Sequence, residues 1–191
     1  EVISGLKGTI YYSPLESLRQ KGQAVLPACE TAVDMLYFKT VWKIKEKYLS
    51  GQEKKDLTQC FGTRMDMLNL QWICRAKKYY HLPEGEIYAM IIPISLHLKK
   101  TEIRAMAQAE DVEQVYALIR NSWYGRLDLG NLEKGQSLEE PCREVIDRIY
   151  ELTSRKEPYS ASVLNSYLYF KEREIEKIIT TIERIRYGVA A

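Results

Sequence analysis

The sequence has few of the residues and patterns that define the common functional classes. Its 191 residues include two histidines and four cysteines, and no Cys-X-X-Cys spacing marks a zinc site. We interpret the cysteines as buried free thiols of a reducing compartment. The longest apolar run, roughly Ile87 to Ile94, is shorter than the about 20 residues of a membrane-spanning helix. The 28 Lys and Arg residues balance 26 Asp and Glu residues, which argues against a strongly basic nucleic-acid binder.

The motifs of common enzyme classes are also missing from the sequence. It has no GxSxG, HExxH, phosphate-binding loop or GxGxxG. We expect His81 and His97 at helix ends or on the surface rather than in catalysis, and we interpret Asp66 and Glu183 as ion-pair partners of cations such as Arg186. The sequence therefore predicts no catalytic residue, no metal site, no cofactor and no small-molecule substrate.

Helical periodicity is what the sequence does contain. Apolar residues recur every three or four positions from Ala28 to Leu49, directly after Pro27, which suits the first turn of a helix. Alternating strand patterns bounded by turn pairs are absent. We therefore predict an all-α fold of about eight helices with short polar connections. Further helices are expected over 54–61, over 66–80 with Thr63 and Asp66 as its capping box, and over 84–92. Thr101 or Asp111 could each cap a further helix, Ser137 caps another, and a last helix runs from Ser160 or Ser162 to Gly188. We expect linkers at 19–23 and 125–135.

An internal repeat is the most informative pattern. Leu6, Tyr12 and Leu15 match Leu118, Tyr124 and Leu127 at an offset of 112 residues. Two further blocks keep the order: Cys29, Asp34 and Tyr37 match Cys142, Asp147 and Tyr150, and Arg64, Ile73 and Arg75 match Arg173, Ile182 and Arg184. The pattern predicts two copies of one helical unit, at 1–110 and 111–191, in a geometry that suits a scaffold.

Both predicted units end in a basic, aromatic helix terminus. The first carries Arg75, Lys77, Lys78 and Tyr79, and the second carries Arg184, Arg186 and Tyr187. Cations stabilise a helix C-terminus through its dipole, which accounts for one or two of them. The first terminus has three cations beside the pair Tyr79 and Tyr80, more than the dipole alone explains. The two termini could face one partner. Anionic lipid and nucleic acid stay open as that partner, and the balanced net charge makes an acidic protein surface at least as suitable.

Three segments together resemble a known family. They are Leu6–Thr9 followed by Tyr11 and Tyr12, the stretch from Asp66 to Ile92, and Ile182–Gly188. They look like the C subunit of V-type and A-type ATP synthases, whose equivalent in the eukaryotic V-ATPase is the d subunit. The resemblance implies a non-catalytic central-rotor protein, built from three similar helical units that form a funnel. It also implies a cytoplasmic position at the membrane, with the central stalk and the membrane proteolipid ring as partners.

The length departs from that family pattern. The chain opens on Glu1, and only two of the three units are visible, so we expect a fragment or processed form that lacks an amino-terminal portion. The resemblance suggests that the stalk or ring contacts a polar, charged face, and the predicted partner-binding residues are Asn69, Arg75, Lys77, Lys78, Tyr79, Arg184, Arg186 and Tyr187. Bracing of neighbouring helices is an alternative role for Asn69 and Tyr187. A helical adaptor unrelated to rotary ATPases and a small helical enzyme stay open as other interpretations of the chain.

Overall fold

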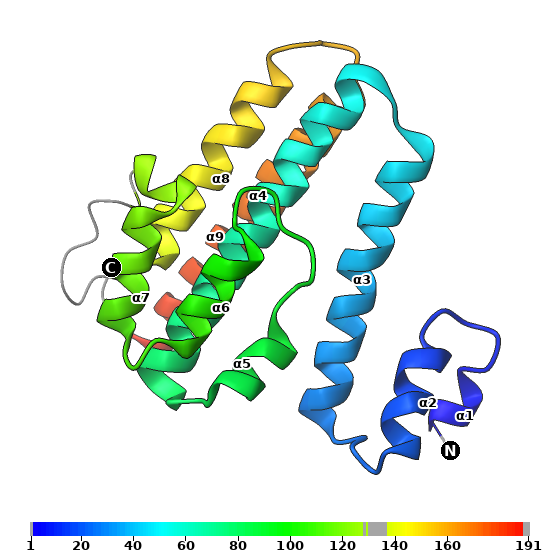
Figure 1. Ribbon diagram of the computed structural model, residues 1–191. Helices are drawn as coiled ribbons and strands as arrows, with labels where there is room; N and C mark the ends of the chain where they lie inside the picture. The colour runs from blue at the N-terminus through cyan, green and yellow to red at the C-terminus, as the bar shows by residue number, and fades with distance from the viewer. Residues whose placement is uncertain (1, 128, 130–136, 189–191) are drawn as a thin grey trace.

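The computed structural model describes residues 2–127, 129 and 137–188, and this part of the chain is helical without a strand, which confirms the all-α prediction. Figure 1 shows long helices side by side, with short helices across one end and a small helical pair beside one long helix. The elements are α1 (Val2–Gly5), α2 (Tyr12–Gln20), α3 (Leu26–Tyr48), α4 (Gly51–Arg75), the π-helix η1 (Ala76–Tyr80), α5 (Glu84–Met90), α6 (Lys100–Gln108), α7 (Val112–Asn121), the 3-10 helix η2 (Trp123–Arg126), α8 (Glu139–Ser154) and α9 (Ala161–Tyr187).

Helix α4 is the centre of the bundle. Its 25 residues pack against α3, α8 and α9, and the short helices α5 and α7 cover another of its faces (Figure 1). The prediction of a break within this segment, with Thr63 and Asp66 starting a new helix, is wrong. Both side chains are buried in one continuous helix, because the polar atoms of Asp66 find their partners in other parts of the chain rather than at a helix start.

Asp66 joins three parts of the fold through its carboxylate. Its oxygens accept backbone N–H bonds from Leu96, His97 and Leu98, at 2.8 to 3.2 Å, and a bond of 2.8 Å from the hydroxyl of Tyr124. Burial raises the pKa of Asp66 above its ordinary value, and the hydrogen bonds from these donors offset only part of that rise. The expectation that Asp66 pairs with a cation is therefore wrong: neutral donors hold this carboxylate in place.

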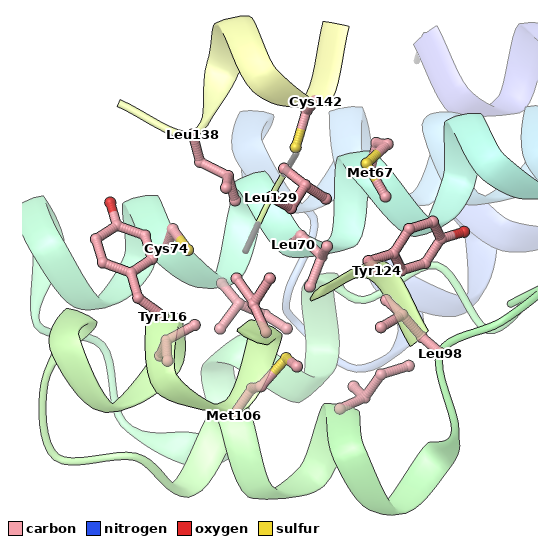
Figure 2. Close-up of a cluster of buried hydrophobic side chains, with 14 of the residues drawn as sticks. Met67, Leu70, Cys74, Leu98, Met106, Tyr116, Tyr124, Leu129, Leu138 and Cys142 are labelled. Carbon is pink, nitrogen blue, oxygen red and sulfur yellow. The ribbon is translucent and has the colours of Figure 1, made fainter. Parts of the chain in front are cut away.

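The main hydrophobic cluster lies between α4 and the segment from α5 to α8. Figure 2 shows Leu70 of α4 among side chains of α6, α7 and η2, with Leu138 and Cys142 closing the cluster from the α8 side. A smaller cluster joins α4, α8 and α9, where the rings of Tyr150 and Tyr169 stack 4.1 Å apart. Since the main cluster draws on both sides of residue 110, the two predicted units share one core.

Several local predictions can be compared with these helices. The helix expected over 28–49 is α3, and Asp111 caps α7 by accepting a 2.8 Å bond from the N–H of Gln114. Gly188 ends α9 in the left-handed conformation, with φ at 65°, as its position predicts. The linker predicted over 125–135 lies mostly outside the described residues.

The order of elements follows the predicted repeat. The hairpin of α3 and α4 and the hairpin of α8 and α9 occupy matching positions in the two units, and the predicted boundary at residues 110 and 111 falls between α6 and α7. The repeat itself stays a prediction from the sequence.

Candidate functional site

The α4 terminus places a set of basic and aromatic side chains at one end of the bundle. After Arg75 the helix widens into the π-turn η1, which closes when the N–H groups of His81 and Leu82 donate to the carbonyl of Ala76. Single π-turns within α-helices are frequent at functional sites. Here Tyr79 and Tyr80 are 62% and 70% exposed.

Lys77 and Lys78 of this turn are half-buried. The ammonium of Lys78 lies 5.4 Å from the ring centroid of Tyr79, within the range of a cation–π contact. Lys78 and Tyr79 also line a small hollow beside Arg75, between α4, α7 and the start of α8. These three predicted residues therefore lie together.

Arg75 ties the end of α4 to the start of α8. Its Nε and Nη2 atoms donate to Oε1 of Glu139, at 3.1 and 2.5 Å, and about half of each side chain is exposed. Ion pairs in such positions contribute roughly 0 to 1 kcal/mol to stability, so the pair orients Arg75 more than it stabilises the fold.

A groove lined with cations runs between α4, α8 and α9. It begins as a hollow of about 190 Å³ beside Arg75 and continues past Arg143 and Arg173 into a second hollow of about 480 Å³ that reaches Arg184. We call this surface the basic groove and define it by its cations, which are Arg64, Arg75, Arg143, Arg173, Lys177 and Arg184. Three carboxylates, those of Glu139, Glu172 and Glu176, share its lining, so positive charge is in excess.

Ion pairs within the protein occupy part of the basic groove. Arg64 lies 3.5 Å from Glu172, and Arg173 lies 3.3 Å from Asp147. Among the described residues, Lys177 and Arg184 form no ion pair of this kind. The end of the groove nearest the α9 terminus therefore carries the charge that is least neutralised within the protein.

Helices α4 and α9 run in the same direction along the basic groove. Figure 1 shows both helices ending at the same end of the bundle, and side chains from matching turns of the two line the same hollow. The structure thus brings Arg75 and Arg184, which the repeat pairs, onto one surface. Sequence reasoning missed Arg143 and Lys177 as groove residues; Arg64 and Arg173 were visible only as a matched pair in the repeat.

Two other predicted partner residues lie outside the basic groove. Arg186 and Tyr187 occupy the last turn of α9, where the guanidinium carbon is 5.8 Å from the ring centroid and Tyr187 is 71% exposed. Both remain accessible at the same end of the bundle as the groove.

The prediction that Asn69 belongs to an exposed partner face is wrong. Asn69 is fully buried, its amide nitrogen donates to the carbonyl of Ile92 at 3.1 Å, and its amide oxygen accepts from the N–H of Ile92 at 2.8 Å. Both ends of the amide are used inside the fold, so Asn69 braces the chain after α5, which is the alternative role named for it.

The histidines occupy structural positions. His81 takes the left-handed conformation that ends η1, with φ at 49°. The ring of His97 stacks on Trp123 at 3.6 Å between centroids, and burial lowers its pKa. Within residues 2–127, 129 and 137–188 we find neither a cluster of three His, Cys, Asp or Glu side chains placed to hold a metal nor a helix long and apolar enough to span a membrane.

Comparison with known proteins gives a consistent result. A family model described as ATP synthase (C/AC39) subunit matches residues 1–191. The C subunit of the A-type ATP synthase of Pyrococcus abyssi is 27% identical over 197 residues, which cover 99% of this chain and 51% of the relative. The corresponding C subunit of Methanobrevibacter smithii is 24% identical over 194 residues, which cover 96% of this chain and 50% of the relative. The chain thus spans about half the length of these curated relatives.

Proposed function

Because the chain belongs to the ATP synthase (C/AC39) subunit family, we propose that it acts as a non-catalytic central-rotor component of a V/A-type rotary ATPase. In this role it couples the central stalk to the membrane proteolipid ring during ATP-driven ion transport or ATP synthesis. It lies at the cytoplasmic side of the membrane and touches the membrane only through the ring. It uses no cofactor, nucleic acid or small-molecule substrate. Residues 1–110 and 111–191 act as two units of a three-unit funnel.

The basic groove is the observation that supports this role most directly. It is a shallow, charged surface built by three long helices rather than a deep apolar pocket. Such a surface suits an acidic protein segment, because complementary charge guides encounter and fixes the register of the partner. We assign the groove and the adjoining side chains of Lys77, Lys78, Tyr79, Arg186 and Tyr187 to binding of the stalk or ring.

The bundle also has the stiffness that torque transfer requires. Helix α9 has 27 residues, which corresponds to a rod of about 40 Å, and α4 is similar in length. The Asp66 network and the bonds between Asn69 and Ile92 fix the short helices to α4. Close-packed interiors transmit strain with little compression, so a load on the groove reaches the rest of the fold.

Binding of the purified protein to isolated central stalk and to isolated proteolipid ring tests the proposal. The double variant Lys177→Glu/Arg184→Glu reverses the two cations of the basic groove that are least neutralised within the protein. We expect its affinity for the stalk or the ring to fall by at least about ten-fold. The affinity that remains should weaken further as salt is added. The matched control is Lys39→Glu, which reverses an exposed cation of α3 away from the groove. We expect it to bind as wild type does.

Two outcomes would refute the proposal. Failure of the folded wild-type protein to bind either stalk or ring excludes the rotor role and favours a helical adaptor unrelated to rotary ATPases. Equal binding by wild type and Lys177→Glu/Arg184→Glu, with both proteins folded by circular dichroism, excludes the basic groove as the binding surface.

A further inference from the structure

The basic groove combines apolar side chains at its base with cations at its rim. The half-buried side chains of Leu68 and Ile146 and the buried ring of Tyr169 line the hollow between α4, α8 and α9. Arg75 and Arg143 line the same hollow, and their side chains are 49% and 43% exposed. An amphipathic helix that carries carboxylates beside its apolar face is the kind of segment that such a groove receives.

The basic groove also has the length of a helix. Its lining follows α9 from Tyr169 to Arg184, and this separation of 15 residues corresponds to about 22 Å of continuous helix. A helix of four turns has the same length. The walls of the groove are helices, and α4 and α9 run in the same direction along it (Figure 1). A further helix laid along these walls would pack as helices do in a bundle.

Two cations of the basic groove define the spacing that such a helix should carry. Among the residues that the structure describes, Lys177 and Arg184 form no ion pair, and both line the second hollow. They lie seven residues apart on α9, which is two turns or about 10 Å. Carboxylates two turns apart on a partner helix share one face and are separated by the same distance. Such a pair can therefore meet both cations at once.

We propose that the basic groove binds an amphipathic acidic helix of a partner protein, with apolar side chains on Leu68 and Ile146 and with carboxylates two turns apart on Lys177 and Arg184. This proposal deepens the proposed function, on which it rests for the use of the groove as a binding surface. Either direction of the bound helix keeps the spacing. A phosphate or a lipid headgroup would use the cations but not the spacing, so the spacing is the property to test.

Two helical peptides of equal composition test the spacing. Both have about 18 residues, are rich in alanine, and carry the same numbers of leucine and glutamate. In the first peptide glutamate recurs at every seventh position, on the same face as the leucines, and in the second it recurs at every fifth position, which spreads the charge around the helix. Fluorescence anisotropy measures binding of each labelled peptide to the purified chain. We expect the first peptide to bind at least about ten-fold more tightly, and added salt should reduce this difference.

Variants of the chain assign the contacts to named residues. Lys177→Glu/Arg184→Glu should abolish the preference for the first peptide, because both proposed partners of its carboxylates are reversed. Leu68→Ser removes an apolar side chain from the base of the groove and should weaken binding of the first peptide by at least about three-fold, with the salt dependence unchanged. The matched control Lys39→Glu should bind both peptides as wild type does. Circular dichroism checks that each variant is folded.

The outcomes separate this proposal from the rotor role. Equal affinity of the wild-type chain for the two peptides, or no binding of either at roughly millimolar concentration, overturns the acidic helix. A preference that survives in Lys177→Glu/Arg184→Glu overturns the assignment of the two cations. A chain that binds the stalk or the ring but does not distinguish the peptides keeps the rotor role and loses the acidic helix. A chain that prefers the first peptide but binds neither stalk nor ring keeps the helix-binding groove and loses the rotor role.

Discussion

The hydroxyl of Tyr124 offers a direct test of the network that holds the short helices on α4. This hydroxyl donates to the buried carboxylate of Asp66 at 2.8 Å, and Tyr124 itself is fully buried. Tyr124→Phe removes the donor and keeps the ring in the cluster. The backbone N–H groups of Leu96, His97 and Leu98 still bind the carboxylate, so the charge does not become unpaired.

The expected cost of Tyr124→Phe follows from that geometry. A hydrogen bond to a charged group contributes about 1.5 to 3 kcal/mol, and the three remaining donors keep the loss near the middle of this range, at about 2 kcal/mol. For a chain of this size that corresponds to a drop in Tm of about 4 to 8 °C. Urea unfolding followed by far-UV circular dichroism measures the change in the free energy of unfolding.

Tyr79→Phe is the matched control, because Tyr79 is 62% exposed and loses its hydroxyl to solvent. We expect its free energy of unfolding to stay within about 0.5 kcal/mol of wild type. A loss of less than about 0.5 kcal/mol in Tyr124→Phe would refute the reasoning, since the hydroxyl would then contribute nothing net to the Asp66 network.

Two further predictions concern acid stability and thiol reactivity. Hydrogen bonds from Lys45 and then Lys54 lower the pKa of Glu46 to about 2 from its usual 4.5, so its contribution to stability is present above pH 4.5 and is lost as the pH falls toward 2. Glu46→Gln should reduce the fall in the urea midpoint over this window, and an unchanged fall would contradict the assignment. A disulfide reagent at mildly alkaline pH should label one thiol quickly in the folded protein, that of the half-buried Cys29, and four after unfolding. Fast labelling of more than one would contradict the buried positions of Cys60, Cys74 and Cys142, whose pKa values burial raises.

Helices with uninterrupted periodicity could be predicted from the sequence, and the centre of the bundle could not. Helix α3 and the end of α9 at Gly188 follow from apolar spacing and end residues. The segment around Thr63 and Asp66 resembles a helix start because both side chains can accept N–H bonds. In the structure the donors to Asp66 come from residues 96–98 and 124, and no local pattern specifies contacts at that separation.

Only part of the candidate site could be predicted from the sequence, because some of its residues are brought together by contacts between helices that are far apart in the chain. The basic ends of α4 and α9 are visible in the sequence as runs of cations, which is why Arg75 and Arg184 could be predicted. Arg143 lies on α8 and joins them only because α4, α8 and α9 pack with matching turns side by side. Asn69 was misplaced because a polar residue near a basic helix end resembles a surface residue, while its partner atoms are on Ile92.

Helices α4 and α9 both carry apolar residues at helical spacing, but those of α4 are buried and the isoleucines of α9 are exposed. Apolar periodicity therefore indicates which face of a helix suits burial, but not what covers that face. Full burial of one isoleucine contributes roughly 1.5 to 3 kcal/mol. Five isoleucines of α9 are at least half exposed, and covering all of them would contribute on the order of 5 to 8 kcal/mol. They are Ile175, Ile178, Ile179, Ile182 and Ile185. Association itself costs 4 kcal/mol or more, roughly, in lost translational and rotational freedom. The five exposed isoleucines of α9 alone therefore support only weak binding of a separate molecule.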